Sequence, residues 1–570
     1  MNGVRRLSKA LPPTAAIAAI GWLQFSYADA SCNTLIEQVA SRAKRMNQQF
    51  RRDLGGHNFA LADEGNDEGG EQLTNWSGTH TITLSKVHAP ETVEELANIV
   101  QQATEKIRPV GSALSPNGLS FSPAGTSAVS MSLLDKIVKV DVPGRTVTVQ
   151  AGCRVSQVVD HLRKHNLTLP NLASIAEQQI GGFVNAGAHG TGATVTPVDD
   201  FVVSMKLVTP AFGEIEVSNK DSGLNKLVFD MCRVGLGAFG IASEYTLRCI
   251  PSHHLLEHTI VLTRAEAVRM LPEMLKSHKH MRYMWIPYVD GVVVVSNDPF
   301  DCQSKDLPKS SPFDGDALEP FKVLLKSHPK NTKDECEIDS MGMGDLRDNL
   351  LDLDPLSTPW VKRVNEAEHE FWKNSQGYRY LPSDRLLQFE CGGQQWVQEV
   401  CFPTGSLYNL ANDDMNFMLR LLDKIESRSL PAPAPIEQRW SASSTSLMSP
   451  ANTTNHPHDT IFSWVGIIMY LTTDEPERRE AITKEFQTTY RDLLEEVGDK
   501  NGIVTHWAKI ELPPKSAPDY DDRLDKLRRR LRERYPIDQF NALRKLFDPR
   551  NVCGNDLIDA LLATEPKRKR

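Results

Sequence analysis

Apolar and polar positions follow two different periods along the first part of the chain. The run TVTVQAG (146–152) alternates like a strand, whereas TVEELANIVQQATE (92–105) and VSQVVDHLRKHN (155–166) carry apolar residues at helical spacing. Short β-branched runs alternate with such helical runs over residues 76–254. The pattern predicts an α/β domain there.

The later pattern is dominated by strand-like runs. These are WVQEVCF (396–402), IFSWVGIIMY (461–470) and IVTHWAKIEL (503–512), while VNEAEHEFWKNS (364–375) and the charged DRLDKLRRRLRERYP (522–536) have helical character. We therefore expect a sheet over residues 255–520, followed by a C-terminal segment, 521–570.

Two stretches lack such patterns. Residues 31–75 include the acidic, glycine-rich run ADEGNDEGGEQ (62–72) and are expected to form a flexible lead-in. Residues 299–345 are rich in Pro, Ser, Asp and Lys, which predicts a surface insertion.

Length and charge limit the function classes. A chain of 570 residues is too long for one ordinary core. Its net charge of −9 argues against nucleic acid as a partner, although a basic protein could be attracted. The nine cysteines have neither CxxC nor CxxH spacing, so the sequence predicts no zinc site and no disulfide framework.

The N-terminus has the composition of a targeting segment. Arg5, Arg6 and Lys9 precede the apolar run AAIAAIGWLQF (15–25), and SYADA follows. A secretory signal and a mitochondrial presequence within residues 1–30 both fit. A single membrane-spanning helix is a third possibility, but the apolar stretch is short for a bilayer.

Two loops of small residues carry the strongest chemical signal. They are VGSALSPNG (110–118) and NLASIAEQQIGGFVNAGAHGTG (171–192), in which glycines allow the backbone to approach a flat, phosphorylated ligand. The first loop alone would also suit an ordinary turn between strands. Two such loops in one domain predict a dinucleotide held from both sides.

Longer motifs accompany the two loops: SGTHTITLSKVHAPET (77–92), FECGGQQWVQEVCFP (389–403), PAPAPIEQRW (431–440), FSWVGIIMYLTT (462–473) and HWAKIELP (506–513). With them the chain, from about residue 75 to about 555, resembles the aldonolactone oxidoreductases of the vanillyl-alcohol oxidase, or PCMH-type, FAD superfamily. The resemblance implies an α+β fold with a PCMH-type FAD-binding domain of two α/β subdomains (76–254). An antiparallel-sheet cap or substrate domain (255–520) would follow, and residues 521–570 would return to the FAD domain.

The resemblance also implies a set of FAD-binding residues in the two loops and just beyond them. These are Val110, Gly111, Ser112, Ala113, Leu114, Ser115, Asn117, Gly118, Ala173, Ser174, Gln178, Gly181, Gly182, Gly187, His189, Gly190, Thr191, Gly192 and Ile241. Ile241 follows GLGAFG (235–240), a formal match to the NAD-binding G-x-G-x-x-G. A strand-like segment follows those glycines where a Rossmann fold needs a helix, so we favour a turn near the adenine of FAD.

Two positions in the loops predict redox behaviour. Many superfamily members bind the flavin covalently through a histidine where this chain has Leu114, so FAD should be bound non-covalently here, as in galactonolactone dehydrogenases. Ala173 stands where related oxidases have glycine, and its methyl group could exclude oxygen from the flavin edge. Alternatively, Ala173 is a packed residue without a role in oxygen reactivity.

Three charged residues are catalytic candidates. Glu437 and Arg439 are two apart in a strand-like run, so they share a face and could hold a polyhydroxylated lactone; a surface ion pair is the alternative. Lys509, expected on one strand face with Trp507 and Glu511, could stabilise negative charge on the reduced flavin, or be a solvated lysine. His189 is expected to shape its loop, and no metal site is predicted.

These observations together predict FAD-dependent oxidation of an aldono-1,4-lactone. The resemblance implies L-galactono-1,4-lactone as substrate, L-ascorbate as product, cytochrome c as acceptor and the mitochondrion, at its inner membrane or intermembrane space. An oxygen-using gulono- or arabinonolactone oxidase is one alternative, and the secretory pathway remains the alternative location. A second alternative function is that of a protein that retains FAD and supports respiratory complex I assembly.

Overall fold

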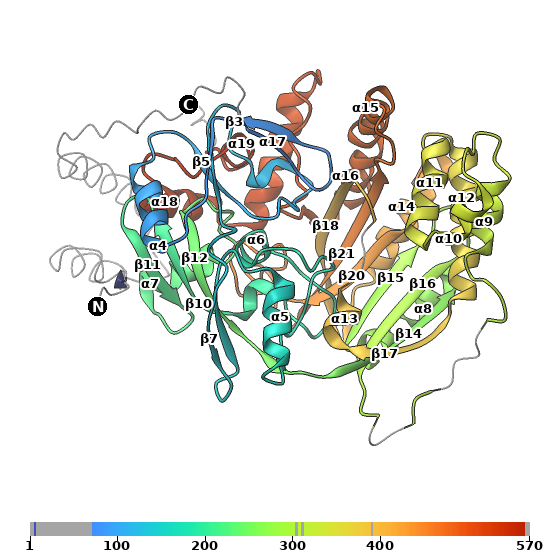
Figure 1. Cartoon of the computed structure of the whole chain (residues 1–570), viewed down its shortest axis with the longest axis horizontal. Coiled ribbons are helices and arrows are strands. Elements are labelled where there is room, and N and C mark those ends of the chain that lie inside the picture. Colours follow the sequence, from blue (N-terminus) through green and yellow to red (C-terminus); the bar gives the residue numbers. More distant parts are fainter. Residues whose placement is uncertain (1–4, 7–70, 303–305, 309–312, 389–391, 565–570) are drawn as a thin grey trace.

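The first half of the chain builds two sheet systems around one hydrophobic core (Figure 1). The computed structural model describes residues 5–6, 71–302, 306–308, 313–388 and 392–564. In the smaller system, β4, β6 and β5 pair in parallel, and a hairpin of β2 and β3 packs beside them. These elements are β2 (Glu71–Thr74), β3 (Thr81–Leu84), β4 (Lys86–His88), α4 (Val93–Gln102), β5 (Ile107–Val110), η1 (Gly118–Ser120) and β6 (Ser127–Ser130).

The second sheet has the strand order β1-β11-β10-β12-β8-β7 and is antiparallel except for β1 against β11. Its strands are β1 (Arg5–Arg6), β7 (Ile137–Asp141), β8 (Thr146–Gln150), β10 (Val202–Thr209), β11 (Gly213–Ser218) and β12 (Ile241–Arg248). Around it lie α5 (Val155–Arg163), α6 (Ile180–Asn185), η2 (Val198–Phe201), α7 (Gly223–Cys232) and the short pair β9 (Leu167–Thr168) and β13 (Ile250–Pro251). The two subdomains agree with the expected α+β fold.

A nine-stranded antiparallel sheet follows, in the order β17-β14-β16-β15-β20-β21-β18-β19, with β22 paired to β18. Its strands are β14 (His254–Leu262), β15 (His280–Trp285), β16 (Val292–Pro299), β17 (Gly377–Pro382), β18 (Gln395–Ser406), β19 (Asn409–Leu410), β20 (Ile436–Ala442), β21 (Thr460–Tyr470) and β22 (Val504–Thr505). Alternate residues face opposite sides, so Tyr283 and Trp285 enter one core and Met284 another.

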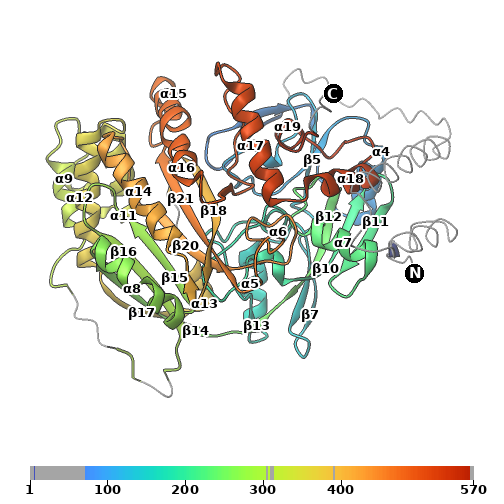
Figure 2. The same ribbon diagram turned by 180° about the vertical axis from the view of Figure 1, so that it is seen from behind.

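Helices cover both faces of this sheet. One face carries α8 (Arg264–Ser277), α14 (Asp413–Ser427), α15 (Pro476–Glu485), η3 (Phe486–Tyr490) and α16 (Arg491–Gly498), seen in front in Figure 2. The other carries α9 (Glu319–Lys326), α10 (Glu335–Ser340), α11 (Met343–Leu353) and α12 (Thr358–Asn374). A short α13 (Ser383–Leu387) follows β17.

The prediction of a surface insertion at residues 299–345 is wrong for its second half. Helices α9 and α10 bury Phe321, Leu325 and Ile338 in a core that they share with α11 and α12. The Pro- and Ser-rich composition concealed apolar residues at helical spacing, which pack against one another and against elements later in the chain. The insertion is thus a helical layer.

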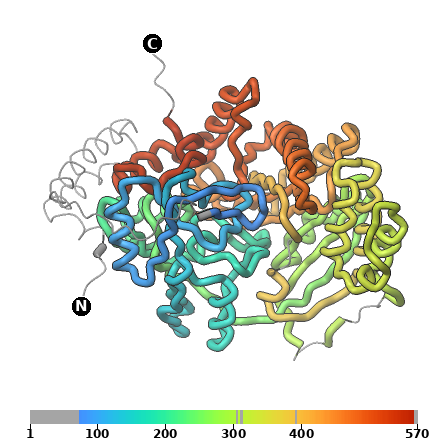
Figure 3. Tube along the Cα trace, turned by 45° about the horizontal axis from the view of Figure 1, so that its top comes forward, coloured from blue at the N-terminus to red at the C-terminus, as the bar shows by residue number. Residues whose placement is uncertain are grey.

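The C-terminal segment returns to the first domain, as the red and blue segments lying side by side in Figure 3 show. It consists of α17 (Tyr520–Arg534), α18 (Ile537–Phe547) and α19 (Asp556–Leu561). The Asn555 side chain donates to the carbonyls of Gly118, Leu119 and Phe121. Met448, Trp507 and Ile510, which were expected in the cap domain, also belong to the first core.

Most of the two N-terminal segments, the expected presequence (1–30) and lead-in (31–75), lies outside the described residues. The end of the lead-in is not a coil, because Glu71–Thr74 forms β2 against β3. Within the described ranges, no helix is long and apolar enough to cross a membrane.

Candidate functional site

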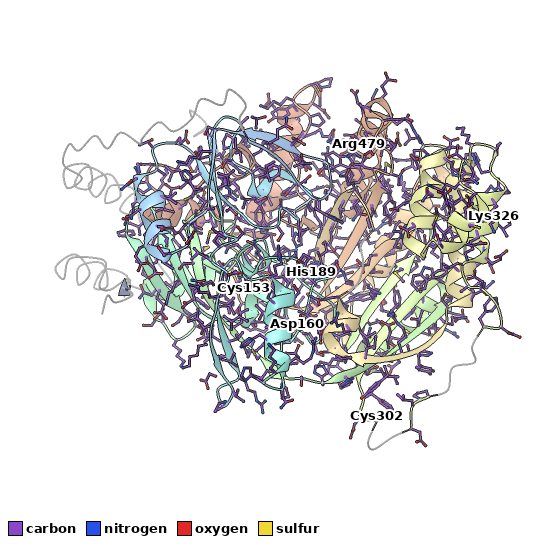
Figure 4. All side chains as sticks on the ribbon, viewed as in Figure 1. Cys153, Asp160, His189, Cys302, Lys326 and Arg479 are labelled. Atoms are coloured by element: carbon purple, nitrogen blue, oxygen red, sulfur yellow. The ribbon has the colours of Figure 1, made fainter. Side chains whose placement is uncertain are left out.

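A cavity of about 540 Å³ lies where the first domain meets the large sheet. One wall is formed by the two small-residue loops, a second by β15, β20, β21 and β18, and a third by α11 and α12. His189 lies at this junction (Figure 4). Three segments that are distant in sequence therefore enclose one space.

The first loop presents its backbone to this cavity through residues 111–116. Ala113 adopts a φ of +49°, and its carbonyl accepts from the Trp76 amide at 2.9 Å. The Asn75 side chain donates to the Ser115 carbonyl at 3.0 Å. The loop is therefore held from behind by the hairpin region, which leaves its other side to a ligand.

The second loop contributes Ala173, Ser174, Gln178 and Gly182 to the cavity. A Cβ placed on Gly182 would have no neighbour within 4 Å, so this glycine opens space. In the part of the chain that the structure describes, the buried side-chain oxygens of Gln178 and Gln179 have no hydrogen-bond partner, and both residues line the cavity. Buried oxygens of this kind require a donor, so the loop fits a polar, multi-ring ligand such as FAD.

Ten of the expected FAD contacts line the cavity: Gly111, Ser112, Ala113, Leu114, Ser115, Ala173, Ser174, Gln178, Gly182 and His189. The other nine do not: Val110, Asn117, Gly118, Gly181, Gly187, Gly190, Thr191, Gly192 and Ile241.

Several of these nine residues have packing roles in the structure. A Cβ on Gly190 would lie 2.1 Å from Asn171 Oδ1, and the Gly192 amide donates to the Trp440 carbonyl at 2.6 Å. Asn117 Nδ2 donates to the carbonyls of Trp507 and Ile510, which joins the first loop to the turn that carries Lys509. Ile241 opens β12 after the GLGAFG turn, as expected for a fold that is not Rossmann-like.

Glu437 and Arg439 lie on the cavity face of β20, as the period of two predicts. Their side chains are 18% and 10% exposed, and Arg439 Nε lies 3.5 Å from Glu437 Oε2. Across the strands, Met284 pairs with Glu437, and Arg282 pairs with Arg439. The geometry does not match a surface ion pair, because both side chains point into an enclosed cavity.

Glu399 on β18 is the centre of the charge network and was not singled out from the sequence. Its Oε1 accepts from Arg439 at 2.8 Å, and its Oε2 accepts from Lys509 Nζ at 2.5 Å. Burial would raise the pKa of Glu399, but the charges of Lys509, His189 and Arg439 hold it well below its usual value. The signal was present: an acid in a strand whose neighbours are buried on both faces needs a cation.

Lys509 reaches the cavity, but not by the route that the pattern suggested. The strand expected over 503–512 is only Val504–Thr505, and residues 507–509 form a turn. Trp507 points away into the first core and donates to the Met448 carbonyl, while Glu511 lies 3.4 Å from His80. Because the turn breaks the alternation, Lys509 does not share a face with these residues.

His189, Glu399 and His506 form a group with metal-ligand chemistry, since their ligand atoms lie within 4.8 Å of one another. No such cluster was expected from the sequence. Burial lowers the pKa of His189, and burial with the Lys509 charge lowers that of His506 well below its usual value. The cations on both Glu399 oxygens make this group an ion-pair network as it stands.

His189 has a larger role than loop shaping. Its ring stacks on Trp464 at 3.7 Å between centroids, and its Nε2 lies 3.2 Å from Glu399 Oε2. His506, Arg282 and Glu368 also line the cavity and were not singled out from the sequence. His189 therefore contacts the acid that holds both cations.

Comparisons with known proteins agree with this architecture. Residues 85–218 match the family described as FAD binding domain, and residues 245–561 match D-arabinono-1,4-lactone oxidase. The solvent-stable cholesterol oxidase is similar in fold, with a TM-score of 0.67 at 16% identity over 87% of this chain and 98% of that one.

Relatives are similar over most of the chain. L-galactono-1,4-lactone dehydrogenase, mitochondrial, of Arabidopsis thaliana is 44% identical over 506 residues, or 86% of this chain and 81% of that protein. Its counterpart, dehydrogenase 1 of Oryza sativa subsp. japonica, is 44% identical over 86% and 83% of the two chains. L-gulonolactone oxidase of Bos taurus is 25% identical over 86% and 98%.

Proposed function

The chain belongs to the aldonolactone oxidoreductases as an FAD-dependent dehydrogenase, and on this premise we propose that it oxidises L-galactono-1,4-lactone to L-ascorbate with cytochrome c as acceptor. The observation that carries the proposal is the convergence of Glu437, Arg439 and Lys509 on one cavity that the two FAD-binding loops also line. A neutral polyhydroxylated ring needs such a mixture of acceptors and fixed donors.

The reaction removes a hydrogen with its electron pair from C2 of the lactone and a proton from the C2 hydroxyl. The 2-keto lactone then tautomerises to the ene-diol. Bound FAD supplies the two-electron acceptor. Arg439 donates to the carbonyl oxygen and stabilises the charge that develops there, and Glu437 accepts from ring hydroxyls and orients them.

Glu399 anchors the two cations of the site. It holds Arg439 and Lys509 in fixed positions, so that their positive charges face the cavity without having to reorganise. Most of the network is buried, which strengthens each interaction with a developing negative charge.

An assay of the purified protein with several lactones, and with cytochrome c or oxygen as acceptor, tests both the substrate and the acceptor. We expect oxidation of L-galactono-1,4-lactone in preference to gulono- and arabinono-lactones, with cytochrome c reduced faster than oxygen. Rapid reaction with oxygen and none with cytochrome c would instead identify a lactone oxidase. The mitochondrial names of the plant relatives support a mitochondrial location, and a role in complex I assembly is a separate proposal that this assay does not address.

The flavin should leave the protein on denaturation. Leu114 lines the cavity where superfamily members with covalent flavin carry histidine, and leucine has no atom that can form that bond. We expect acid precipitation to release all yellow colour into the supernatant. Colour that stays with the precipitated protein would show a covalent attachment at another residue.

Oxygen reactivity should depend on Ala173. This residue is 9% exposed and lines the cavity, so its methyl group can occupy the path of oxygen to the flavin edge. Ala173→Gly is expected to speed reoxidation of the reduced enzyme by air at least about tenfold, or roughly 1.4 kcal/mol of barrier, with little change in reduction by lactone. Stopped-flow measurement of both rates tests this, and fast reoxidation of the wild type would already contradict it.

A further inference from the structure

The wall of the cavity that belongs to neither the FAD domain nor the large sheet is polar. Helices α11 and α12 contribute Asp345, Arg347, Glu368 and Trp372 to it. These helices belong to the layer that begins within the 299–345 segment. The reaction as proposed so far does not use this wall.

Glu368 is the informative residue of this wall. It is 1% exposed, and its Oε2 has no hydrogen-bond partner among the described residues, while Oε1 accepts a long bond of 3.4 Å from Trp372 Nε1. An uncompensated carboxyl oxygen is costly to bury unless a ligand supplies its donor. Because Glu368 lines the cavity, a ligand in the cavity can supply it.

Arg347 gives the same wall a donor. Its guanidinium lies 4.5 Å over the Tyr470 ring, and a Cβ on Gly392 would lie 2.8 Å from its NH2. Arg347, Tyr470 and Gly392 all line the cavity, and Gly392 adopts a φ of +81°. The glycine therefore leaves room for the guanidinium beside Glu368. Burial raises the pKa of Glu368 and the Arg347 charge lowers it, and the effect of burial is the larger.

The wall is fixed relative to the catalytic strand. Asn365, one turn before Glu368 on α12, donates to the carbonyls of Pro287 and Ala432 and accepts from the Ala434 amide. Ala434 is three residues before Glu437. The hydrogen bonds of Asn365 to residues 432 and 434 thus fix the position of Glu368 relative to the Glu437–Arg439 pair. A site that holds both ends of one ligand needs such a fixed spacing.

We propose that Glu368 and Arg347 form a subsite for the exocyclic hydroxyl groups of the lactone, so that the helical layer selects among aldonolactones by their side chain. An aldonolactone is uncharged, and its exocyclic hydroxyls both donate and accept, which matches a carboxyl beside a guanidinium. The inference rests on the proposed lactone oxidation and extends it to the end of the substrate away from C2.

The test compares two lactones in Glu368→Leu. One is L-galactono-1,4-lactone, and the other is a tetronolactone with the same ring but no exocyclic carbon. The Kd of each lactone is measured from the change that binding causes in the flavin spectrum. We expect the Kd of L-galactono-1,4-lactone to rise at least about tenfold, because the variant loses a hydrogen bond to a polar group of the ligand. The Kd of the tetronolactone should stay within about twofold. Glu366→Leu, an exposed position on the same helix, is the matched control and should change neither.

Stability separates a binding role from a structural one. Leucine fills a similar volume and removes the unpartnered oxygen, so Glu368→Leu should unfold at the wild-type temperature or above. Glu368→Gln, which retains hydrogen bonding, should shift the ratio of the two Kd values in the same direction by a smaller factor. An unchanged ratio in both variants, with lactone oxidation intact, would overturn the subsite alone. If wild type binds and oxidises neither lactone, the proposed function fails as well.

Discussion

Arg439→Ala is expected to lower lactone turnover by about 10²-fold or more, and Glu437→Ala by a similar factor. Both side chains line the cavity. In the proposed mechanism the guanidinium donates to the lactone carbonyl oxygen, and the carboxylate accepts from the ring hydroxyls. Neither residue belongs to the FAD-binding loops, so FAD content should stay normal. Steady-state kinetics with cytochrome c and the flavin absorbance of each variant are the measurements.

A matched control distinguishes catalysis from the loss of any ion pair. Lys206 and Glu244 pair at 2.7 Å in the second sheet, with side chains 23% and 17% exposed, and neither lines the cavity. Glu244→Ala should leave turnover near that of wild type. Near-native turnover in both Arg439→Ala and Glu437→Ala would assign that pair a structural role.

Glu399→Gln is expected to lower both turnover and stability. The amide keeps the shape of the side chain but leaves the charges of Lys509 and Arg439 without their shared counterion. Removing one partner of a buried ion pair costs about 3 kcal/mol of unfolding free energy, and less to the extent that Lys509 reaches solvent. Denaturant unfolding measures the cost, and turnover per bound flavin measures the effect on the site.

The difference between wild type and Glu399→Gln should also depend on pH. The pKa of Glu399 in the folded protein is lowered, so its contribution to stability is fully present above its ordinary pKa of 4.5 and is lost as the pH falls toward the lowered value. The two proteins should therefore converge in stability in acid. A difference that stays constant down to the acid transition would contradict this account of the network.

Asp414→Asn controls for the burial of an acid in general. Asp414 is buried on the other face of the sheet, where it accepts from Trp440 Nε1 at 2.8 Å, and burial raises its pKa. Its replacement should alter stability without lowering turnover per bound flavin. An equal loss of turnover in both variants would assign Glu399 no more than a packing role.

The local features of the site could be predicted from the sequence. A period of two places Glu437 and Arg439 on the same face of β20 because successive strand residues alternate. The small residues of 110–118 indicated a loop that lets a ligand approach its backbone, and Ala113 with a φ of +49° lies within it. The expectation of a non-covalent flavin likewise depends on one residue, Leu114 in place of histidine.

Other features depend on partners far away in the chain. Lys509 enters the cavity from a turn that Asn117 holds by hydrogen bonds to residues about 390 positions later in the chain. Strand alternation predicted a strand face for Lys509, but residues 507–509 form a turn. The Pro- and Ser-rich segment 299–345 contains helices whose apolar residues are buried in a core shared with α11, α12 and β21. Composition reports on a segment alone, whereas burial depends on what packs against it.

The sequence by itself therefore determined the two small-residue loops, the strand face of the Glu437–Arg439 pair and the succession of α/β and sheet domains, because each depends on neighbours within a few residues. Only the tertiary structure decided that Glu399 joins Arg439 and Lys509, and that Glu368 faces the same cavity. An acid in an apolar strand indicates that a cation is needed, but not which residue supplies it. Glu399 meets its cations only where β18, β20 and the 507–509 turn come together in the fold, because electrostatic interactions act through space rather than along the chain.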